Sequence, residues 1–380
     1  MDIPLDYATL KVIWWALVGV LFIGYAVTDG YDLGVATLLP FVGKTDDERR
    51  LVINSIAPMW EGHQVWLITG GGALFAAWPY VYAISFSGFY LAMFVVLAAL
   101  ILRPVGFKYR SKRAGKQWRR NWDWALFTGG FVPALIFGVA LGNVLQGVPF
   151  DIDRTMRATY DGGLLGLLNP FALLAGLASV AMLVVHGASW LVVKIEHGPV
   201  MDRAILYGRL AAIAVIAFYA IAGIWLWQSG MGYRIVSDID PHGPANPLRK
   251  DVVVEAGAWM GNYARYPFLL LAPLAGFGGS LLALWALGRK SSLALAGSGF
   301  ASAGIVASVG ASMFPFILPS SVNPSVSLTV WDSSSSHITL FIMLIATAIF
   351  LPLVLAYTAW VFKVLWGRLT VEEATSEGKY

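Results

Sequence analysis

Apolar runs long enough to cross a lipid bilayer dominate this chain. Residues 83–102, 129–145, 171–193 and 338–362 are the clearest examples, and a bilayer core takes about 20 residues of helix to span. Of the 380 residues, 58% are hydrophobic and only 13% are charged. A water-soluble protein would interrupt such runs with charge, because it has a surface to solvate. The sequence therefore predicts an all-α integral membrane protein.

Several kinds of site and partner are excluded by what the sequence lacks. Without cysteine there is no disulfide framework, thiolate metal site or thioether haem anchor. No basic run alternates with aromatic residues as in a nucleic-acid site, and no Walker loop, dinucleotide fingerprint, catalytic triad or metal motif is present. The first apolar run follows acidic residues, whereas a signal peptide has a basic start, so we expect it to be a retained helix.

Counting apolar stretches between charged or Gly/Pro-rich breaks predicts nine membrane helices. They lie near 10–38, 48–73, 79–103, 123–145, 165–193, 203–228, 265–287, 292–314 and 337–363. The second contains Glu61 and His63, and hydropathy alone would discard it and leave eight. No low-complexity linker divides the chain, so we expect 1–380 to form a single polytopic membrane domain.

Basic residues determine the expected orientation. The loop 103–122 carries eight Lys or Arg residues and no acid, and such loops stay cytoplasmic. Strict alternation from this loop puts the acid-rich loops 146–164 and 229–264 outside and the C-terminus in the cytoplasm. With the second helix included, Lys44, Arg49 and Arg50 become cytoplasmic. Nine helices with an external N-terminus satisfy the positive-inside rule best.

Ionisable residues inside membrane helices are candidates for function, because burying them in hydrocarbon costs a few kcal/mol. Asp29 and Asp32 are three residues apart, so they share a helix face, and we expect that face to point into the bundle. Carboxylates in such a place can transfer protons. The alternative is a helix end near the cytoplasmic surface, where both acids contact water.

Glu61 belongs to a polar and aromatic cluster in the run PMWEGHQVW. We expect it to lie deeper in the membrane if the second helix exists. His63 is two residues away and does not share its face. Trp60, His63 and Gln64 complete a cluster that indicates an ion, proton or cofactor site, the alternative being a structural hydrogen-bond network. The other intramembrane histidines, His186 and His337, are single in their helices and predict no haem ligation.

Intramembrane acids and Gly/Pro-broken helices are also typical of a proton-coupled secondary transporter. Such a protein is recognised by internal inverted repeats, which are not visible in this sequence, and by substrate-induced changes in a single purified chain. A channel would require a ring or filter element, which is also not visible. Composition alone favours the transporter.

Long ordered strings across nearly the whole chain reverse that preference. They are WWALVGVLFIGYAVTDGYDLGV at 14–35, NSIAPMWEGHQVWLITGGGALFAAWP at 54–79, SGFYLAMFVVLAALILRPVGFKYRSK at 87–112, GNVLQGVPF at 142–150, NPLRKDVVVEAGAW at 246–259, MFPFILPSS at 313–321 and WDSSSSHITL at 331–340. With these strings the chain resembles subunit II of cytochrome bd-type quinol oxidases.

The resemblance implies a partner, subunit I, that carries haems b and d and the quinol site, whereas this chain binds no haem. It also implies small single-helix accessory subunits, ubiquinol or menaquinol as electron donor, and dioxygen reduced to water with protons taken from the cytoplasm without pumping. The expected fold is two four-helix bundles plus one peripheral helix in the bacterial cytoplasmic (inner) membrane. Some family members hold a structural quinone in subunit II.

The resemblance further implies a proton path from the cytoplasm toward the haems of subunit I. Its acids would be Asp32 in GYDLG and Glu61 in MWEG, with Asp29 beside the first; the residues near the cytoplasmic mouth would be Arg103, Lys112 and Asp123. Two departures stand out. The family motif commonly reads Trp-Asp-Gly-Asn where this chain has Trp60-Glu61-Gly62-His63, and position 108 is Lys108 where a near relative would carry an acid.

Overall fold

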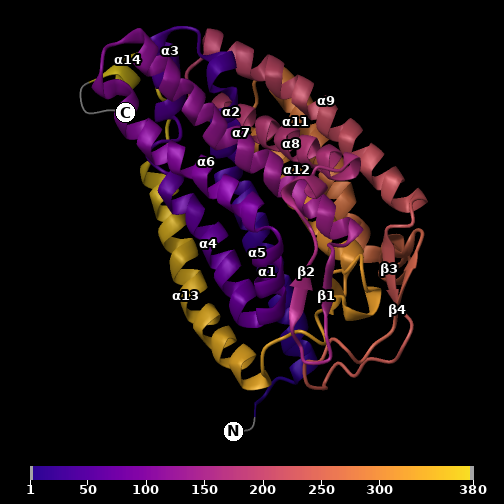
Figure 1. Cartoon of the computed structure of the whole chain (residues 1–380). Helices are drawn as coiled ribbons and strands as arrows, with labels where there is room; N and C mark the ends of the chain where they lie inside the picture. The colour runs from indigo at the N-terminus through magenta and orange to yellow at the C-terminus, as the bar shows by residue number, and fades with distance from the viewer. Residues whose placement is uncertain (1–2, 377–380) are drawn as a thin grey trace.

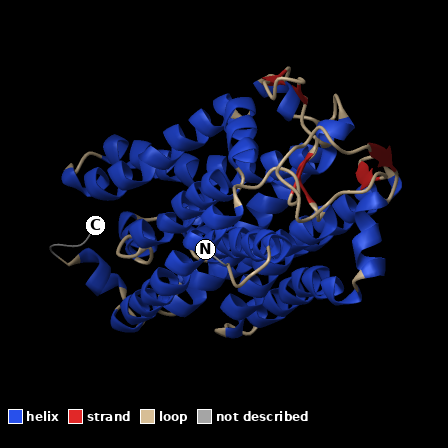
Figure 2. Cartoon of the chain, turned by 90° about the horizontal axis from the view of Figure 1, so that it is seen from below, coloured by secondary structure: helices blue, strands red, loops and turns tan. Residues whose placement is uncertain are grey.

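Long helices run side by side through the molecule, and short strands gather at one end (Figures 1 and 2). The computed structural model describes residues 3–376. Its principal helices are α1 (Tyr7–Val27), α2 (Asp29–Val42), α3 (Asp46–Asn54), α4 (Trp60–Ala77), α5 (Pro79–Gly88), α6 (Tyr90–Tyr109), α7 (Lys116–Gln146), α8 (Pro170–Lys194), α9 (Pro199–Gln228), α11 (Leu271–Gly288), α12 (Leu293–Met313) and α13 (His337–Val364). Two short helices are α10 (Gly261–Arg265) and α14 (Val371–Thr375), and α14 lies beside α3 at one end of the bundle (Figure 1).

Eight segments of residues 3–376 are long and apolar enough to cross a membrane. They are Tyr7–Val42, Tyr90–Lys112, Lys116–Gln146, Pro170–Lys194, Pro199–Gln228, Pro267–Gly288, Leu293–Met313 and His337–Val364. The first joins α1 and α2 through Thr28. Helix α4 has 18 residues but is not among them, since polar side chains in its first turns lower its mean hydropathy.

The second predicted helix, 48–73, is wrong as a single element. A capping box of Thr45 and Glu48 begins α3, which ends at Asn54, and α4 begins only at Trp60. Pro58 lies in the turn between them, where it lacks an amide hydrogen and disfavours helix at the preceding residue. The Trp190 indole donates to the Ser55 carbonyl at 3.1 Å and so satisfies one backbone group released by the break.

The third predicted helix is also divided, and the fourth begins earlier than expected. Phe89 separates α5 from α6, and α6 continues to Tyr109. Helix α7 starts at Lys116, after a short 3-10 turn at Arg110–Lys112. The basic segment 103–122 is therefore mostly helical, with only residues 113–115 between the two elements.

The connections at the opposite end contain three small antiparallel sheets. Strands β1 (Phe150–Ile152) and β2 (Ala158–Tyr160) form one pair, β3 (Gly232–Ile235) and β4 (Val252–Glu255) the second, and β5 (Phe316–Leu318) and β6 (Leu328–Thr329) the third. Helix α1 also begins at this end. Its first residue is held there by a hydrogen bond from the Tyr7 hydroxyl to the Ser335 carbonyl at 2.6 Å. The buried Lys11 ammonium donates to the carbonyls of Pro241 and Trp331, which attaches the long β3–β4 connection to α1.

Helices α2 and α8 cross so closely that only glycine fits at the contact. A Cβ atom at Gly34 would lie 1.9 Å from the Leu183 carbonyl oxygen, and one at Gly187 would lie 2.5 Å from the Gly34 carbonyl carbon. Small residues at such contacts let membrane helices approach where lipid provides no hydrophobic drive. This crossing holds the first turn of α2, which carries Asp29 and Asp32, against the centre of the bundle.

Gly34→Ala is expected to destabilise the protein by about 3 kcal/mol, because the added methyl meets backbone and no side-chain rotation can relieve the clash. The amount of protein in the membrane and its thermal unfolding temperature measure the effect. Gly19→Ala is the matched control, since a Cβ at Gly19 meets nothing within 4 Å. Equal behaviour of the two variants would contradict the proposed close crossing.

Candidate functional site

A buried ion pair joins α2 to α6. The Arg103 guanidinium donates to both carboxylate oxygens of Asp29, with Nη1 to Oδ2 at 3.0 Å and Nη2 to Oδ1 at 2.7 Å. Asp32 lies one helical turn further on, with its Oδ2 at 3.9 Å from Arg103 Nη2. All three side chains are fully buried. The shared interior face of Asp29 and Asp32 is as their spacing predicts, whereas Arg103 lies inside the bundle and not at its mouth.

His63 extends this group of charges to α4. Its Nδ1 lies 2.6 Å from Asp32 Oδ2, its Nε2 lies 3.2 Å from the Tyr31 hydroxyl, and its ring stacks on Phe362 of α13. An ionised Asp32 only accepts, so Nδ1 then carries a proton, and in a neutral imidazole Nε2 accepts from Tyr31. We call Asp29, Tyr31, Asp32, His63 and Arg103 the inner cluster.

The inner cluster keeps unused hydrogen-bonding capacity. Asp32 Oδ1 and Arg103 Nε are buried and have no hydrogen-bond partner among the described residues. Buried polar atoms are normally paired, and a carboxylate with one free oxygen can accept a proton or a bridging water. Asp32 is therefore the member of the cluster best placed to exchange a proton.

A second group of charges lies near the end of the bundle where α3 and α14 are located (Figure 1). Asp123 on α7 accepts from Arg110 Nε at 2.5 Å and from Arg49 Nη1 at 2.7 Å. Arg110 also donates to Asp46 at 2.9 Å, and Asp46 pairs with Arg119. Asp123 and Arg110 are buried, while the others are partly exposed. We call Asp46, Arg49, Arg110, Arg119 and Asp123 the surface cluster.

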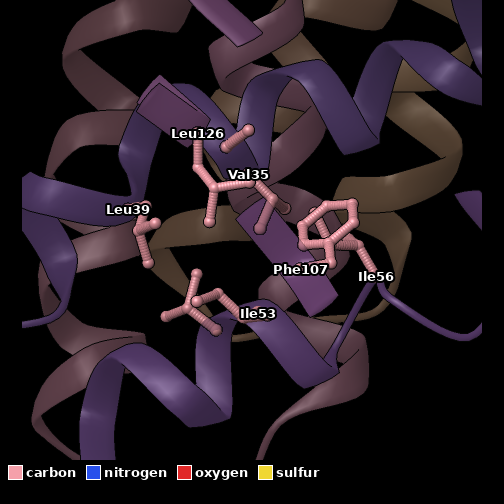
Figure 3. A pocket seen from close by; sticks show the side chains of 8 residues that line it. Val35, Leu39, Ile53, Ile56, Phe107 and Leu126 are labelled. Atoms are coloured by element: carbon pink, nitrogen blue, oxygen red, sulfur yellow. The ribbon is translucent and has the colours of Figure 1, made fainter. Parts of the chain in front are cut away.

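An apolar layer separates the two clusters. Arg110 follows Arg103 by seven residues on one segment, a rise of about 10 Å. The layer between them is formed by Val35, Ala36, Leu39, Val52, Ile53, Ile56, Phe107 and Leu126 (Figure 3). The gap among these side chains has no room for a water molecule. In this structure the surface cluster therefore has no hydrated connection to the inner cluster through this layer.

The predicted cluster around Glu61 is divided between two faces of α4. His63 and Trp60 are buried, and the Trp60 ring centroid lies 5.8 Å from the Arg103 guanidinium carbon. Glu61 is exposed on the outer face, and Gln64 is half-buried. Residues two apart in a helix point in nearly opposite directions, so Glu61 and His63 lie on different faces of α4, as their spacing predicts. Lys112 is exposed in the 3-10 turn that follows α6, and it belongs to neither cluster.

Sequence reasoning missed Tyr31 of the inner cluster and four members of the surface cluster, Asp46, Arg49, Arg110 and Arg119. Tyr31 could have been found from its position between two candidate acids. The arginines could not be distinguished from other basic residues of the cytoplasmic side, because their partners lie far away in the sequence. Among residues 3–376, no three His, Cys, Asp or Glu side chains converge as a metal site.

Comparisons with known proteins agree over almost the whole chain. Residues 10–365 match the family model "Cytochrome bd terminal oxidase subunit II". The "Probable cytochrome oxidase subunit 2" of Haemophilus influenzae is 50% identical, with 96% of each chain covered. The "Cytochrome bd-I ubiquinol oxidase subunit 2" of Escherichia coli is 49% identical over 97% of each chain. The structure of bd oxidase from Geobacillus thermodenitrificans matches with a TM-score of 0.65 at 16% identity, covering 94% of this chain and 98% of that one.

Proposed function

This chain belongs to the cytochrome bd terminal oxidase subunit II family, and we propose that it is the haem-free subunit of a complex that oxidises ubiquinol or menaquinol and reduces dioxygen to water. The named relatives and the eight membrane-length helices support this function. Its partner would be subunit I with haems b and d, and small single-helix subunits would complete the complex in the bacterial inner membrane.

The proposed topology has nine crossings, with the N-terminus outside and the C-terminus in the cytoplasm. Helix α4 would supply the ninth crossing, since it follows α3 at one end of the bundle (Figure 1) and the carbonyl of its last residue, Ala77, accepts from the Ser335 amide at 2.7 Å, close to the start of α13. Helix α13 would be the peripheral helix outside two four-helix bundles: only 6% of its spanning window is buried, against 56% for α8. Asp2 and Lys379, which also agree with this orientation, lie outside the described residues.

The proposed role in the reaction is proton delivery. Reduction of dioxygen consumes protons, and the surface cluster with Asp123 would receive them at the cytoplasmic side. The inner cluster would then hold them at Asp32, whose free oxygen is the observation that carries this proposal. The dry layer between the clusters would have to admit water transiently, because proton transfer needs a continuous hydrogen-bonded path.

Glu61 would pass protons from this chain to subunit I. It lies on an outer face of α4 with the exposed apolar side chains Val65 and Ile68. A carboxylate on a membrane-facing surface is costly, so we propose that this face meets the partner subunit and that Glu61 finds a polar partner there. The same contact would support assembly of the complex.

A structural quinone remains a prediction from the resemblance. The apolar layer of Figure 3 does not fit one, because its gap is too narrow for a ring and none of its eight side chains can donate a hydrogen bond. We derive no step of the reaction from a quinone in this chain.

His63→Asn, which restores the amide common in the family motif, is expected to lower quinol-dependent oxygen consumption severalfold at unchanged haem content. Asparagine can still bond Asp32 but cannot relay a proton between Asp32 and Tyr31. The pH profile of the rate should change with it, since an ionisable group has been removed. Gln64→Asn, which alters a neighbouring half-buried amide, is the control. If the rate and the pH profile are unchanged in His63→Asn, His63 has only a structural role.

Affinity purification of the tagged chain from its native membrane in mild detergent tests the proposed function. We expect a haem-bearing partner to copurify, with a reduced-minus-oxidised haem spectrum and quinol-dependent oxygen uptake. A colourless single chain from cells that express the partner would contradict the oxidase assignment and favour the proton-coupled secondary transporter.

A further inference from the structure

A cavity of about 340 Å³ opens where three helices end, on the side of the molecule that carries the surface cluster. It is lined by Trp190, Val193 and Lys194 from the end of α8, Ser292 before α12, and Trp366, Gly367 and Arg368 after α13. The volume falls in the range of small-molecule sites, which are about 300–1,000 Å³. None of these residues belongs to the inner or surface cluster.

The polar lining of the cavity is suited to an anion. Arg368 is exposed and forms no salt bridge within residues 3–376. Lys194 lies beside it and donates to the Leu365 carbonyl at 2.5 Å. The Ser292 side chain makes no capping bond to α12, so its hydroxyl can donate into the cavity. A guanidinium and a hydroxyl together can bind a phosphate group.

Two acidic side chains near the cavity already have partners. Glu196 accepts from the Val371 amide at 2.9 Å, and Asp202 pairs with Lys290 at 2.7 Å. Arg289 stacks on Trp285, with its guanidinium carbon 4.2 Å from the ring centroid. The charged residues that line the cavity itself, Lys194 and Arg368, are both basic, and basic pockets between membrane helices on the cytoplasmic side are typical sites for anionic lipid headgroups.

The apolar surroundings fit a lipid better than a small ion. Trp366 is exposed, as expected of an indole at the level of the headgroups. Leu293, the first residue of α12, and Val364, the last residue of α13, are also exposed and give the surroundings of the cavity an apolar border. A water-soluble anion would gain nothing from this apolar border.

We propose that this cavity binds the phosphate-bearing headgroup of an anionic phospholipid, with Arg368 and Ser292 on the phosphate and the exposed Trp366 beside the glycerol region. The site would anchor the segment after α13 to the membrane surface. This inference needs the membrane-spanning helices but not the oxidase function, so it can succeed or fail independently of the proposed proton path.

Native mass spectrometry of the complex in nanodiscs of phosphatidylethanolamine and phosphatidylglycerol tests the site. The unaltered complex is expected to retain phosphatidylglycerol selectively. Arg368→Gln should weaken that retention about fivefold, the factor for one cation at the membrane surface, which contributes about 1 kcal/mol. Arg368→Lys should restore most of it. Lys363→Gln removes an exposed cation that does not line the cavity and should change little.

Three results would overturn the proposal. Equal retention in Arg368→Gln and the unaltered complex would exclude the site, and equal losses in Arg368→Gln and Lys363→Gln would indicate diffuse surface charge. Inorganic phosphate, added in excess, distinguishes a site for a lipid headgroup from a site for free phosphate. We expect it to leave the lipid bound, and displacement would show that the cavity takes the free anion instead.

Discussion

Replacing Arg103 with glutamine is expected to remove most of the assembled complex from the membrane. Arg103 is the bidentate partner of Asp29 and lies 3.9 Å from Asp32, and all three are fully buried. Without the guanidinium, two carboxylates would share one buried site with only His63 to compensate. Breaking a buried ion pair on one side costs about 3–5 kcal/mol, a large part of the about 5–15 kcal/mol that stabilises a typical protein.

A double variant distinguishes charge imbalance from loss of packing. Asp29→Asn together with Arg103→Gln removes both partners of the ion pair, so it should recover a substantial part of the complex lost in Arg103→Gln alone. Haem content per milligram of membrane protein measures assembly, and thermal unfolding of the purified complex measures stability. Arg120→Gln, at an exposed position of α7, is the control. Normal haem content in Arg103→Gln would contradict the account of the inner cluster.

The sequence predicts much of this architecture because crossing a bilayer imposes a length and a composition that few other structures share. The apolar runs correspond to the eight candidate spans, and the spacing of Asp29 and Asp32 predicts their common face. Helix boundaries were less accurate. The turn at Pro58 and the early start of α7 at Lys116 depend on local capping and on packing, which hydropathy does not report.

The composition of the site could be predicted only in part. Arg103 is 74 residues from Asp29, and their pairing depends on how α6 packs, so a charge at a helix end could not be assigned to the interior. The spacing of Glu61 and His63 predicts that they lie on different faces of their helix, but it does not predict which of the two points inward. Hydropathy cannot tell which face of a short, weakly apolar helix meets the bundle, and the structure places His63 on that face.

The central claim is that this chain delivers protons to its partner, and Glu61 is the residue that would connect the two. Its carboxylate faces outward from α4, whereas His63 on the opposite face binds Asp32 at 2.6 Å. Glutamine keeps the size and polarity of the side chain but cannot carry a proton, so any contact with the partner should survive. A positioned proton-transfer group typically contributes about 10²–10⁴-fold to rate.

Oxygen consumption per haem in Glu61→Gln tests this claim most directly. We expect a rate lower by about a hundredfold or more, since such groups contribute about 10²–10⁴-fold, at nearly normal haem content. Glu372→Gln, an exposed acid of α14, should leave both unchanged. Parallel loss of oxygen consumption and haem content in Glu61→Gln would contradict proton delivery and assign Glu61 to assembly of the complex.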